Sequence, residues 1–339
     1  MPQEFKLIDQ YFLPLSQSML AGDVGIGDDG AVITPPLDHQ LVIVTDTLVQ
    51  DVHFTAETLP NEIAWKAVAV NLSDLAAMGA KPGFISLALT LPKNEQAWLN
   101  DFSKGLAEVC LVYQTPLVGG DTTKGPLTIT ITAHGWVEQG TALLRSGAQV
   151  GDVIGVSGYL GDAGLGLKIA LNRLTQNEQA CLNPSDVKSC LQALNYPQPQ
   201  LELGRLLRGY ANSAIDISDG LLADLTHILE RSNGHLQLQG VDELGAEIYL
   251  DQLPLSSAMQ KWFEQGIEWS LPLSAGDDYQ LCFTIRPERW SELQSAAEAQ
   301  GLKISKIGKI IQKQGVLVKP TKDSEQVFNG DAKLGYQHF

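Results

Sequence analysis

The sequence predicts a mixed α/β (α+β) fold in two domains, on three observations. Short apolar runs rich in β-branched residues alternate with longer stretches of helical periodicity. The length of 339 residues exceeds that of a typical single domain. The composition is globular, with 44% hydrophobic and 18% charged residues, so the chain can bury sizeable cores.

Several short apolar runs are predicted to be strands, because each is rich in β-branched residues and bounded by polar or glycine residues. Period-two alternation in one of them would place Asp216 and Ser218 on the same side of its strand. The predicted strands are Leu41–Val44, Leu127–Thr132, Val153–Ser157, Ala214–Ser218 and Gly315–Val318.

Three stretches are predicted to be helices, namely Ile63–Met78, Ala163–Leu174 and Leu221–Leu229. For the first, we expect Asn61 as the N-cap and Gly79 as the C-terminal stop, with Pro82 preventing continuation. The segment Asn172–Gln200 is polar and contains three prolines, so we expect a surface excursion without an assigned role.

A domain boundary is expected near Val137–Gly151. The sequence Glu138-Gln139-Gly140 follows a predicted strand, and Gly151-Asp152 starts a new strand–glycine loop–helix unit. We therefore expect an N-terminal domain over residues 1–148 and a C-terminal α/β domain over residues 149–339.

The charge balance excludes several classes of partner. The chain has 23 Lys and Arg against 39 Asp and Glu, a formal net charge of -16, so it repels phosphate backbones and nucleic-acid binding is not expected. No apolar run reaches the ~20 residues of a membrane span, and Met1–Gln10 lacks a signal-peptide core. We therefore expect no membrane partner and a cytoplasmic location, with the four cysteines reduced.

Aspartates gather in six short motifs, often beside glycine or at strand ends. Carboxylates with open neighbouring backbone suit Mg²⁺, which takes oxygen ligands and usually bridges to substrate phosphates. A turn or a helix cap is the alternative for any one motif, but it explains the repetition poorly. The motifs are Gly27–Gly30, Thr45–Thr47, Asn71–Asp74, Gly119–Asp121, Asp216–Gly220 and Gly276–Asp278.

Asp74 is the sharpest single case, because it lies in the otherwise apolar or small stretch Ala67–Met78. Burying a lone carboxylate there would be costly, so we expect Asp74 at an active site on a metal, with a hydrogen-bonded structural Asp as the alternative.

Asp219 and the glycine-rich loop each have two interpretations. Asp219 is either a site residue or the cap of the helix that follows it. The glycine-rich loop Gly158–Gly166 could approach a phosphate or simply form a tight turn.

Two further residues are candidates with open alternatives. Arg145 is a rare cation in an acidic chain, and it would contact a nucleotide phosphate unless it is a surface residue. His53 follows Asp46 by seven residues and is either a site residue or a structural histidine. No Ser–His–Asp, zinc-ligand or Walker A spacing occurs in the sequence.

Taken in order, the motifs resemble the thiamine-monophosphate kinase family. It belongs to a superfamily of ATP-binding enzymes that includes aminoimidazole ribonucleotide synthetase, selenophosphate synthetase and a hydrogenase-maturation protein. The resemblance covers nearly the whole chain, and the Asp-x-His-Phe and C-terminal Gly-x-x-His-Phe motifs are the more particular to this kinase. The matching segments are Gly25–Asp29, Thr45–Val49, Asp51–Phe54, Asn71–Ala80, Gly119–Thr122, Asp216–Leu221, Gly276–Tyr279 and Gly335–Phe339.

The resemblance implies that ATP phosphorylates thiamine monophosphate to thiamine diphosphate by direct in-line transfer. It implies an N-terminal ATP- and Mg²⁺-binding domain whose sheets pair across a homodimer, and a C-terminal domain with a substrate-contacting tail. It implies that several Mg²⁺ ions are held by Asp29, Thr45, Asp46, Asp74, Asp121, Asp216 and Asp219, with Asp46, Asp74, Asp121 and Asp219 catalytic. It also implies that Gly120, Asp121, Arg145 and Ser218 contact ATP, and that His53, Asp277 and Tyr336 contact thiamine monophosphate.

Asp277 departs from the family pattern, which commonly has Glu at this position, so the side chain is one methylene shorter. Two other classes of function remain open. One is a related enzyme that uses ATP to activate a carbonyl or amide oxygen, although the chain lacks the N-terminal or C-terminal Cys that such enzymes use. The other is a non-catalytic acidic protein that binds divalent cations, although no EF-hand pattern is present.

Overall fold

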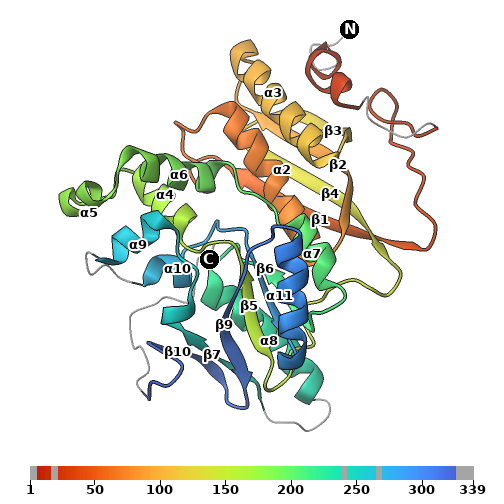
Figure 1. The fold of residues 1–339 in the computed structure, drawn as a ribbon. Helices are drawn as coiled ribbons and strands as arrows, with labels where there is room; N and C mark the ends of the chain where they lie inside the picture. The colour runs from red at the N-terminus through yellow and green to blue at the C-terminus, as the bar shows by residue number, and fades with distance from the viewer. Residues whose placement is uncertain (1–5, 17–21, 238–242, 265–268, 326–339) are drawn as a thin grey trace. The chain divides into compact units, whose positions relative to one another are not determined.

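The chain forms two compact units, each with its own β-sheet (Figure 1). This computed structural model describes residues 6–16, 22–237, 243–264 and 269–325. The first unit comprises Met1–Leu75, Ala80–Thr141 and Asn195–Pro197, and the second comprises Ala76–Gly79, Ala142–Leu194 and Gln198–Phe339. The expected mixed α/β fold is confirmed.

The first unit contains a mixed four-stranded sheet in the order β1-β4-β2-β3. β4 pairs antiparallel with β1 and β2, whereas β2 pairs parallel with β3. The sheet therefore places the strands that carry Asp46 and Asp121 at its two edges. The strands are β1 (His39–Val49), β2 (Lys81–Leu91), β3 (Leu117–Lys124) and β4 (Thr128–Glu138).

Helices α2 (Pro60–Ala77) and α3 (Gln96–Tyr113) lie side by side over one face of this sheet (Figure 1). Their close approach depends on Gly105, where a Cβ would lie 2.4 Å from the backbone oxygen of Asn61. The strands alternate buried and accessible residues, as expected for a sheet covered on one face. Leu41 and Ile43 of β1 belong to the accessible set, with exposed fractions of 45% and 58%.

Helix α2 has the predicted extent but not the predicted N-cap. It begins at Pro60, so Asn61 lies inside the helix and donates from Nδ2 to the Tyr196 hydroxyl over 2.7 Å. The Glu62 carboxylate instead accepts the Leu59 N–H, which is the reciprocal half of a capping box. The predicted stop is confirmed, because Gly79 has a φ of +68° and its N–H donates to the Ala76 oxygen.

The second unit contains a six-stranded sheet in the order β10-β7-β9-β5-β8-β6. Only the β10–β7 pair is parallel among these neighbours. β6 ends at Asp216, so Ser218 lies beyond the strand rather than on its face as predicted. The strands are β5 (Val153–Ser157), β6 (Ser213–Asp216), β7 (Gly245–Tyr249), β8 (Leu281–Ile285), β9 (Ile304–Ile311) and β10 (Gly315–Lys319).

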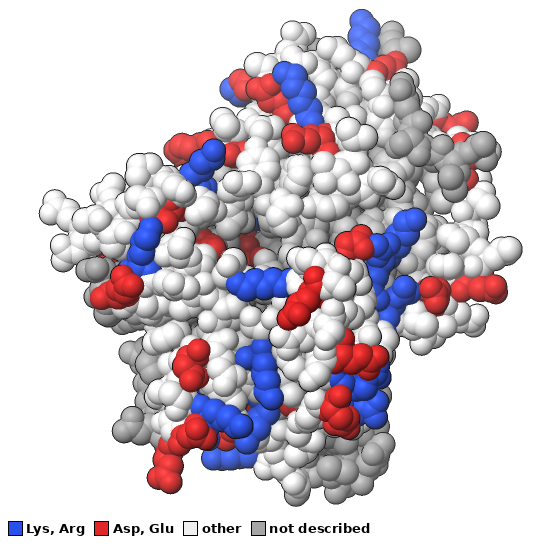
Figure 2. All heavy atoms as spheres, in the orientation of Figure 1, with Lys and Arg blue, Asp and Glu red and all other residues white. Residues whose placement is uncertain are grey.

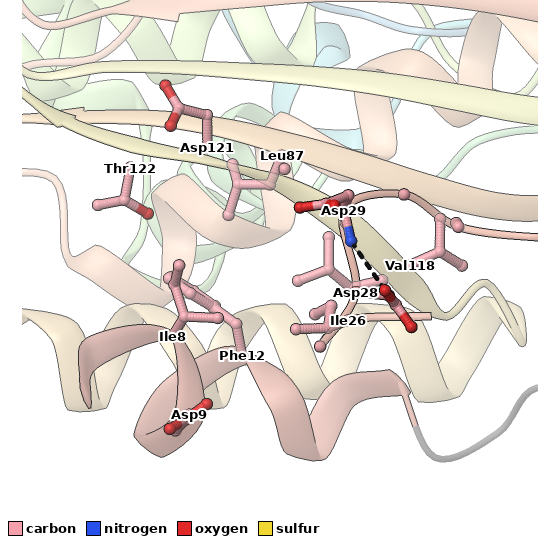
Figure 3. Close-up of a pocket in the computed structure, with 16 residues that line it drawn as sticks. Ile8, Asp9, Phe12, Ile26, Asp28, Asp29, Leu87, Val118, Asp121 and Thr122 are labelled. Carbon is pink, nitrogen blue, oxygen red and sulfur yellow. Dashed lines mark hydrogen bonds between the residues drawn. The ribbon is translucent and has the colours of Figure 1, made fainter. Parts of the chain in front are cut away.

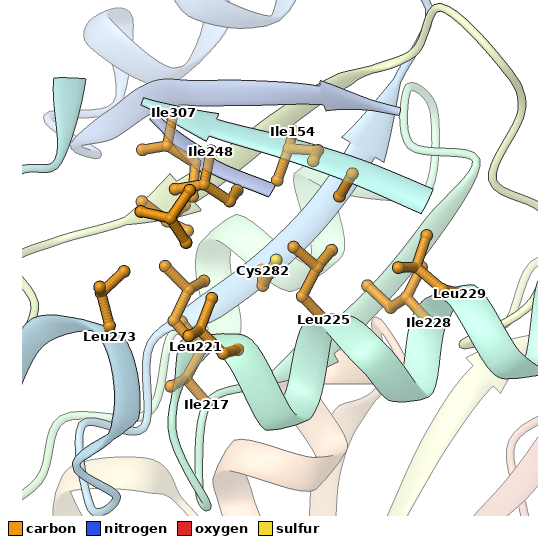
Figure 4. Close-up of a cluster of buried hydrophobic side chains, with 14 of the residues drawn as sticks. Ile154, Ile217, Leu221, Leu225, Ile228, Leu229, Ile248, Leu273, Cys282 and Ile307 are labelled. Carbon is orange, nitrogen blue, oxygen red and sulfur yellow. The ribbon is translucent and has the colours of Figure 1, made fainter. Parts of the chain in front are cut away.

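Helix α8 (Leu221–Gln237) supplies the main apolar stripe of this unit. Its residues Leu221, Leu225 and Ile228 pack against strand residues that include Ile154 and Ile248 (Figure 4). The spacing of three and four residues is that of one helix face. The remaining described helices and 3₁₀ turns of the unit are α4 (Asp162–Ala170), α5 (Gln176–Cys181), α6 (Pro184–Asn195), α7 (Leu201–Leu207), α9 (Ser257–Glu264), α10 (Ser270–Ser274), α11 (Trp290–Ala299), η3 (Leu250–Gln252) and η4 (Pro287–Arg289).

The segment Asn172–Gln200 is more than the surface excursion that was expected. It contains the helices α5 and α6, and Cys190 is fully buried. The buried Asp186 carboxylate accepts from Lys261 of α9 over 2.6 Å. The polar sequence was misleading because the apolar residues of α6 form only one narrow stripe.

The surface agrees with the acidic composition. On the face shown in Figure 2, Lys and Arg side chains are interspersed with Asp and Glu. None of the helices in the described parts of the chain is long and apolar enough to cross a membrane. All four cysteines are free.

Candidate active site

A pocket of about 570 Å³ lies within the first unit (Figure 3). Acidic residues, including Asp28, Asp29 and Asp121, and apolar residues, including Phe12 and Leu87, line it together. The complete lining is Ile8, Asp9, Phe12, Ile26, Gly27, Asp28, Asp29, Gly30, Ala31, Leu87, Leu117, Val118, Gly119, Gly120, Asp121 and Thr122.

The pocket brings two of the six aspartate motifs together, Gly27–Gly30 and Gly119–Asp121. Ser16 joins them, because its hydroxyl donates to the Leu117 oxygen over 2.7 Å and accepts the Ile26 N–H over 3.2 Å. Ser16 ends the short turn η2 (Leu13–Ser16), which follows η1 (Ile8–Phe12). The N-terminal segment therefore fixes the loop that carries Asp28 and Asp29 beside the start of β3.

Gly120 has a role that only glycine can fill. Its φ is +155°, and a Cβ would lie 1.8 Å from the carbonyl oxygen of Leu87 on β2. Any side chain would push β3 away from β2 at the pocket. The adjacent Asp121 is exposed and lines the pocket.

The electrostatics of this pocket favour cations. Carboxylates of Asp9, Asp28, Asp29 and Asp121 line it without an Arg or Lys. Within the described ranges, no three His, Cys, Asp or Glu side chains form a group that could hold a metal ion. Mg²⁺ usually takes only one or two carboxylates and completes its coordination with water and substrate phosphates. The oxygen donors present therefore fit Mg²⁺ that arrives with a phosphorylated ligand.

Asp46 and Asp74 are tied to one buried residue, Asn71. Asn71 Oδ1 accepts the backbone N–H of Asp46 over 3.1 Å, and its Nδ2 donates to Ala67 in the preceding turn of α2. Asp74 lies one turn further along the same helix and is the one residue from 63 to 77 that is not buried. The sequence argument about Asp74 predicted this accessibility, whereas the role of Asn71 was missed.

Thr45 and His53 flank this group on β1 and the turn that follows it. The Thr45 hydroxyl donates to Thr132 on β4 over 3.0 Å. His53 Nδ1 accepts the Val49 N–H over 3.0 Å, so the neutral ring carries its proton on Nε2. The buried Lys66 of α2 donates to the His53 carbonyl oxygen over 3.4 Å, which fixes the turn against the helix.

In the second unit, one buried carboxylate organises the Asp216–Gly220 motif. Asp224 Oδ2 accepts the backbone N–H groups of Ser218, Asp219 and Gly220 over 3.0, 3.1 and 3.1 Å. These amides belong to the turn that leads into α8 at Leu221, so the Asp224 carboxylate holds this turn against the first turn of the helix. Asp216 is 4% exposed at the end of β6, beside this turn.

Burial raises the pKa of Asp224 to about 7, and repulsion from Asp216 and Asp219 adds to this effect. The hydrogen bonds from the Asp219 and Gly220 amides oppose the rise. Sequence reasoning missed Asp224, although it is an acidic residue on a helix whose neighbours Leu221, Leu222 and Leu225 are apolar. The argument applied to Asp74 would have found it.

The glycine loop Gly158–Gly166 joins β5 to α4, and one of its backbone amides has a partner within the chain. The Gly161 N–H, at the start of α4, already donates to Asp278 Oδ2 over 2.8 Å. Asp278 is 9% exposed, and burial raises its pKa while the Gly161 amide counteracts that effect. The Gly161 amide is therefore already occupied by a carboxylate of the chain, and a phosphate contact by the other amides of this loop stays a prediction.

Asp277 is held in a rigid segment next to the Asp216–Gly220 motif. Its N–H donates to the Ser218 oxygen over 2.9 Å, and the Tyr279 N–H donates to the Ile217 oxygen over 2.8 Å. The Asp277 side chain is half-buried and accepts from the Tyr279 hydroxyl. Asp277 and Ser218 are thus neighbours in the fold, as a common site requires.

Two predicted site residues, Arg145 and Tyr336, are not placed beside the other site residues by the contacts described above. Arg145 is exposed in the loop before β5, in the second unit. Tyr336 lies outside the described residues. The structure therefore groups Asp29, Gly120 and Asp121 in one pocket, and joins Asp46 to the helix of Asp74 within the first unit. In the second unit it groups Asp216, Ser218, Asp219 and Asp277.

Comparisons with known proteins identify the family. Residues 27–137 match the model of the AIR synthase related protein, N-terminal domain. The chain is 42% identical over 340 residues to the thiamine-monophosphate kinase of Haemophilus influenzae, covering 99% of this chain and 98% of that protein. The chain belongs to the thiamine-monophosphate kinase family.

Solved structures of thiamine-monophosphate kinases share the fold. The crystal structure of the enzyme from Stenotrophomonas maltophilia K279a is 40% identical, with a TM-score of 0.81 and coverage of 94% of this chain and 97% of that chain. A structure of AaThiL complexed with AMPPCP and TMP is 31% identical, with a TM-score of 0.72 and coverage of 89% and 90%. The expected two-domain fold of this kinase family is confirmed.

Proposed function

We propose that this chain is an enzyme that transfers the γ-phosphoryl group of ATP to thiamine monophosphate, giving thiamine diphosphate and ADP. The observation that carries the proposal is family membership over essentially the whole chain, at 42% identity with the Haemophilus influenzae kinase. A relative at 31% identity has been crystallised with AMPPCP and TMP. The chain also has the aspartate motifs that resemble those of such a kinase, with the departure at Asp277.

The pocket of the first unit is proposed as part of the nucleotide site. Its apolar residues suit a flat base, and the backbone at Gly119 and Gly120 allows close approach of a ligand. Gly120, Asp121, Arg145 and Ser218 are the proposed ATP contacts. Arg145 is the one cation in this set, so it would meet a phosphate.

Mg²⁺ is the proposed metal, because the candidate donors are almost all carboxylate oxygens. Asp29, Thr45, Asp46, Asp74, Asp121, Asp216 and Asp219 are the proposed ligands, shared among several ions and completed by phosphate oxygens and water. Bound Mg²⁺ would neutralise the phosphate oxygens in the transfer. The acidic lining of the pocket would repel free ATP, so nucleotide binding there would depend on Mg²⁺ ions that bridge the carboxylates and the phosphates.

The protein's own task is to align two anions that repel each other. His53 and Asp277, together with Tyr336, are the proposed contacts to thiamine monophosphate. Asp277 would pair with its cationic thiazolium ring or its amino group, and Tyr336 would stack on the substrate. The acceptor phosphate is already ionised at neutral pH, so the reaction needs no strong general base.

A homodimer is the proposed assembly. Leu41 and Ile43 lie on the sheet face of the first unit that α2 and α3 leave uncovered. An exposed apolar sheet face of this kind is expected to pack against another protein surface, here the same face of a second copy. The cytoplasmic location expected from the sequence stays a prediction.

The test of the function is turnover of ATP with and without thiamine monophosphate, with detection of thiamine diphosphate by mass spectrometry. We expect ADP and thiamine diphosphate in equal amounts, and no ATP turnover when the acceptor is omitted. ATP hydrolysis without the acceptor would favour a superfamily enzyme acting on another oxygen nucleophile. Tight Mg²⁺ binding without any turnover would favour a non-catalytic cation-binding protein.

A further inference from the structure

Tyr279 makes a short-range hydrogen bond that the proposed reaction leaves unexplained. Its phenolic hydroxyl donates to Asp277 Oδ1 over 3.2 Å, two residues back along the chain. The tyrosine is 9% exposed, so its ring is packed in the second unit and only the hydroxyl reaches the half-buried carboxylate. A buried tyrosine hydroxyl needs a partner, but this partner is a proposed substrate contact.

The backbone around Tyr279 is held on two sides. The N–H groups of Asp277 and Tyr279 donate to the oxygens of Ser218 and Ile217, and the Asp278 carboxylate accepts the Gly161 N–H. These bonds fix the Cα positions of the three residues. The remaining freedom of Asp277 is the rotation of its side chain, which is the freedom that the Tyr279 hydroxyl restricts.

The segment also keeps an unfavourable backbone conformation. Asp277 has a φ of 69° and Tyr279 a φ of 47°, both in the left-handed region, which Asp tolerates better than Tyr does. Aromatic residues rarely adopt it. Such strain clusters at functional sites, where the surrounding structure enforces it. Here it occurs at the two residues that the side-chain hydrogen bond joins.

We propose that Tyr279 is a positioning residue for Asp277, whose hydroxyl fixes the plane of the carboxylate presented to the cationic part of thiamine monophosphate. The inference rests on the proposed function, because it needs Asp277 to contact that substrate. The proposal also agrees with the presence of Asp at position 277, where the family commonly has Glu. An aspartate has one torsion fewer than the glutamate common in the family, so less side-chain freedom remains for the Tyr279 hydroxyl to restrict.

The test is Tyr279→Phe, which removes one oxygen atom and keeps the ring. Tyr249→Phe is the matched control, because Tyr249 is also buried in the second unit and donates to Glu247, again two residues back, over 3.0 Å. We expect Tyr279→Phe to raise the KM for thiamine monophosphate about 10-fold, with the KM for ATP and kcat within about 2-fold of wild type. Tyr249→Phe should leave all three kinetic constants unchanged.

A double-mutant cycle with Asp277→Ala separates positioning from a merely structural role. In the Asp277→Ala background, Tyr279→Phe should have no further effect on the KM for thiamine monophosphate, because the carboxylate it orients is gone. Equal effects on both substrates, a full effect in the Asp277→Ala background, or failure of Tyr279→Phe to fold would overturn the proposal. Failure of the proposed function is seen separately, as absence of thiamine diphosphate with the wild-type protein.

Discussion

The backbone N–H of Asp277 donates to the carbonyl oxygen of Ser218 over 2.9 Å. These two residues are proposed to contact different ligands, thiamine monophosphate and ATP respectively. A rigid backbone bond between them means that a shift of either segment moves the other. The relative placement of acceptor and donor in an in-line transfer therefore depends in part on this one bond.

Asp46→Asn and Asp74→Asn are each expected to abolish turnover while the protein stays folded. Each removes one carboxylate charge from a proposed Mg²⁺ site, and phosphoryl transfer depends on metal neutralisation of the phosphate oxygens. Thermal unfolding should change little, because repulsion among clustered carboxylates is relieved. Asp101→Asn on the exposed surface of α3 is the control, and it should retain activity. Near wild-type turnover of either site variant at saturating Mg²⁺ would refute its assignment.

Gly120→Ala is expected to destabilise the protein by about 2 kcal/mol or more and to weaken ATP binding. The physical reason is the Cβ position, 1.8 Å from the Leu87 oxygen at a φ of +155°. Gly119→Ala is the matched control for stability alone, because a Cβ there meets nothing within 4 Å of the protein although Gly119 also lines the pocket. Urea unfolding and nucleotide titration of both variants provide the measurement. Equal stability of the two variants would contradict the close approach of β3 and β2.

Asp224→Asn is expected to reduce the pH dependence of stability in magnesium-free buffer. The folded pKa of about 7 lies above the unfolded value near 4, so the folded protein binds more protons between these values. The free energy of unfolding of the wild type should therefore fall as pH rises from 4 to 7, by up to about 1.4 kcal/mol per pH unit from this group. Urea unfolding at pH 5 and pH 7 measures the slope. If the free energy of unfolding of the variant had the same slope against pH as that of the wild type, Asp224 would not titrate between pH 5 and pH 7.

Chirally labelled γ-phosphate is expected to emerge with inverted configuration. Carboxylates that hold Mg²⁺ have their lone pairs committed to the metal and are poor nucleophiles, so we expect no phosphoaspartate. ADP–ATP exchange should then be absent without thiamine monophosphate. Retention of configuration, or exchange by the enzyme alone, would demonstrate a phosphoenzyme.

Much of the fold follows from local sequence patterns. Val153–Ser157 is the strand that its β-branched run predicted, and Gly79 ends α2 because it alone tolerates the left-handed conformation there. The accessibility of Asp74 followed from the cost of burying a lone carboxylate. These features depend on residues that are close together in the sequence, so they can be predicted from the sequence alone.

The missed features depend on contacts distant in the chain or on competing hydrogen-bond partners. The Gly161 amide is occupied by Asp278, which lies 117 residues away in sequence, so no local pattern shows that this amide already has a partner. Asp224 reaches back from within α8 to the backbone amides of the Asp216–Gly220 motif, a contact that depends on how the helix and the preceding turn fold together. The sequence also could not show that Asn71 joins the helix of Asp74 to the strand of Asp46, since this bond depends on tertiary packing.

Helix α2 combines core packing and an accessible acidic residue within a single turn. From Ile63 to Ala77 every residue except Asp74 is buried, and Asn71 is bonded on both ends of its amide. In evolutionary terms this leaves the helix almost no neutral positions. We expect a substitution at a buried residue to lower the abundance of the folded protein, and one at Asp74, a proposed Mg²⁺ ligand, to leave abundance intact and remove activity. Saturation mutagenesis scored for both properties would therefore separate Asp74 from every neighbour, and drift in this helix should be slower than in the exposed segments around it.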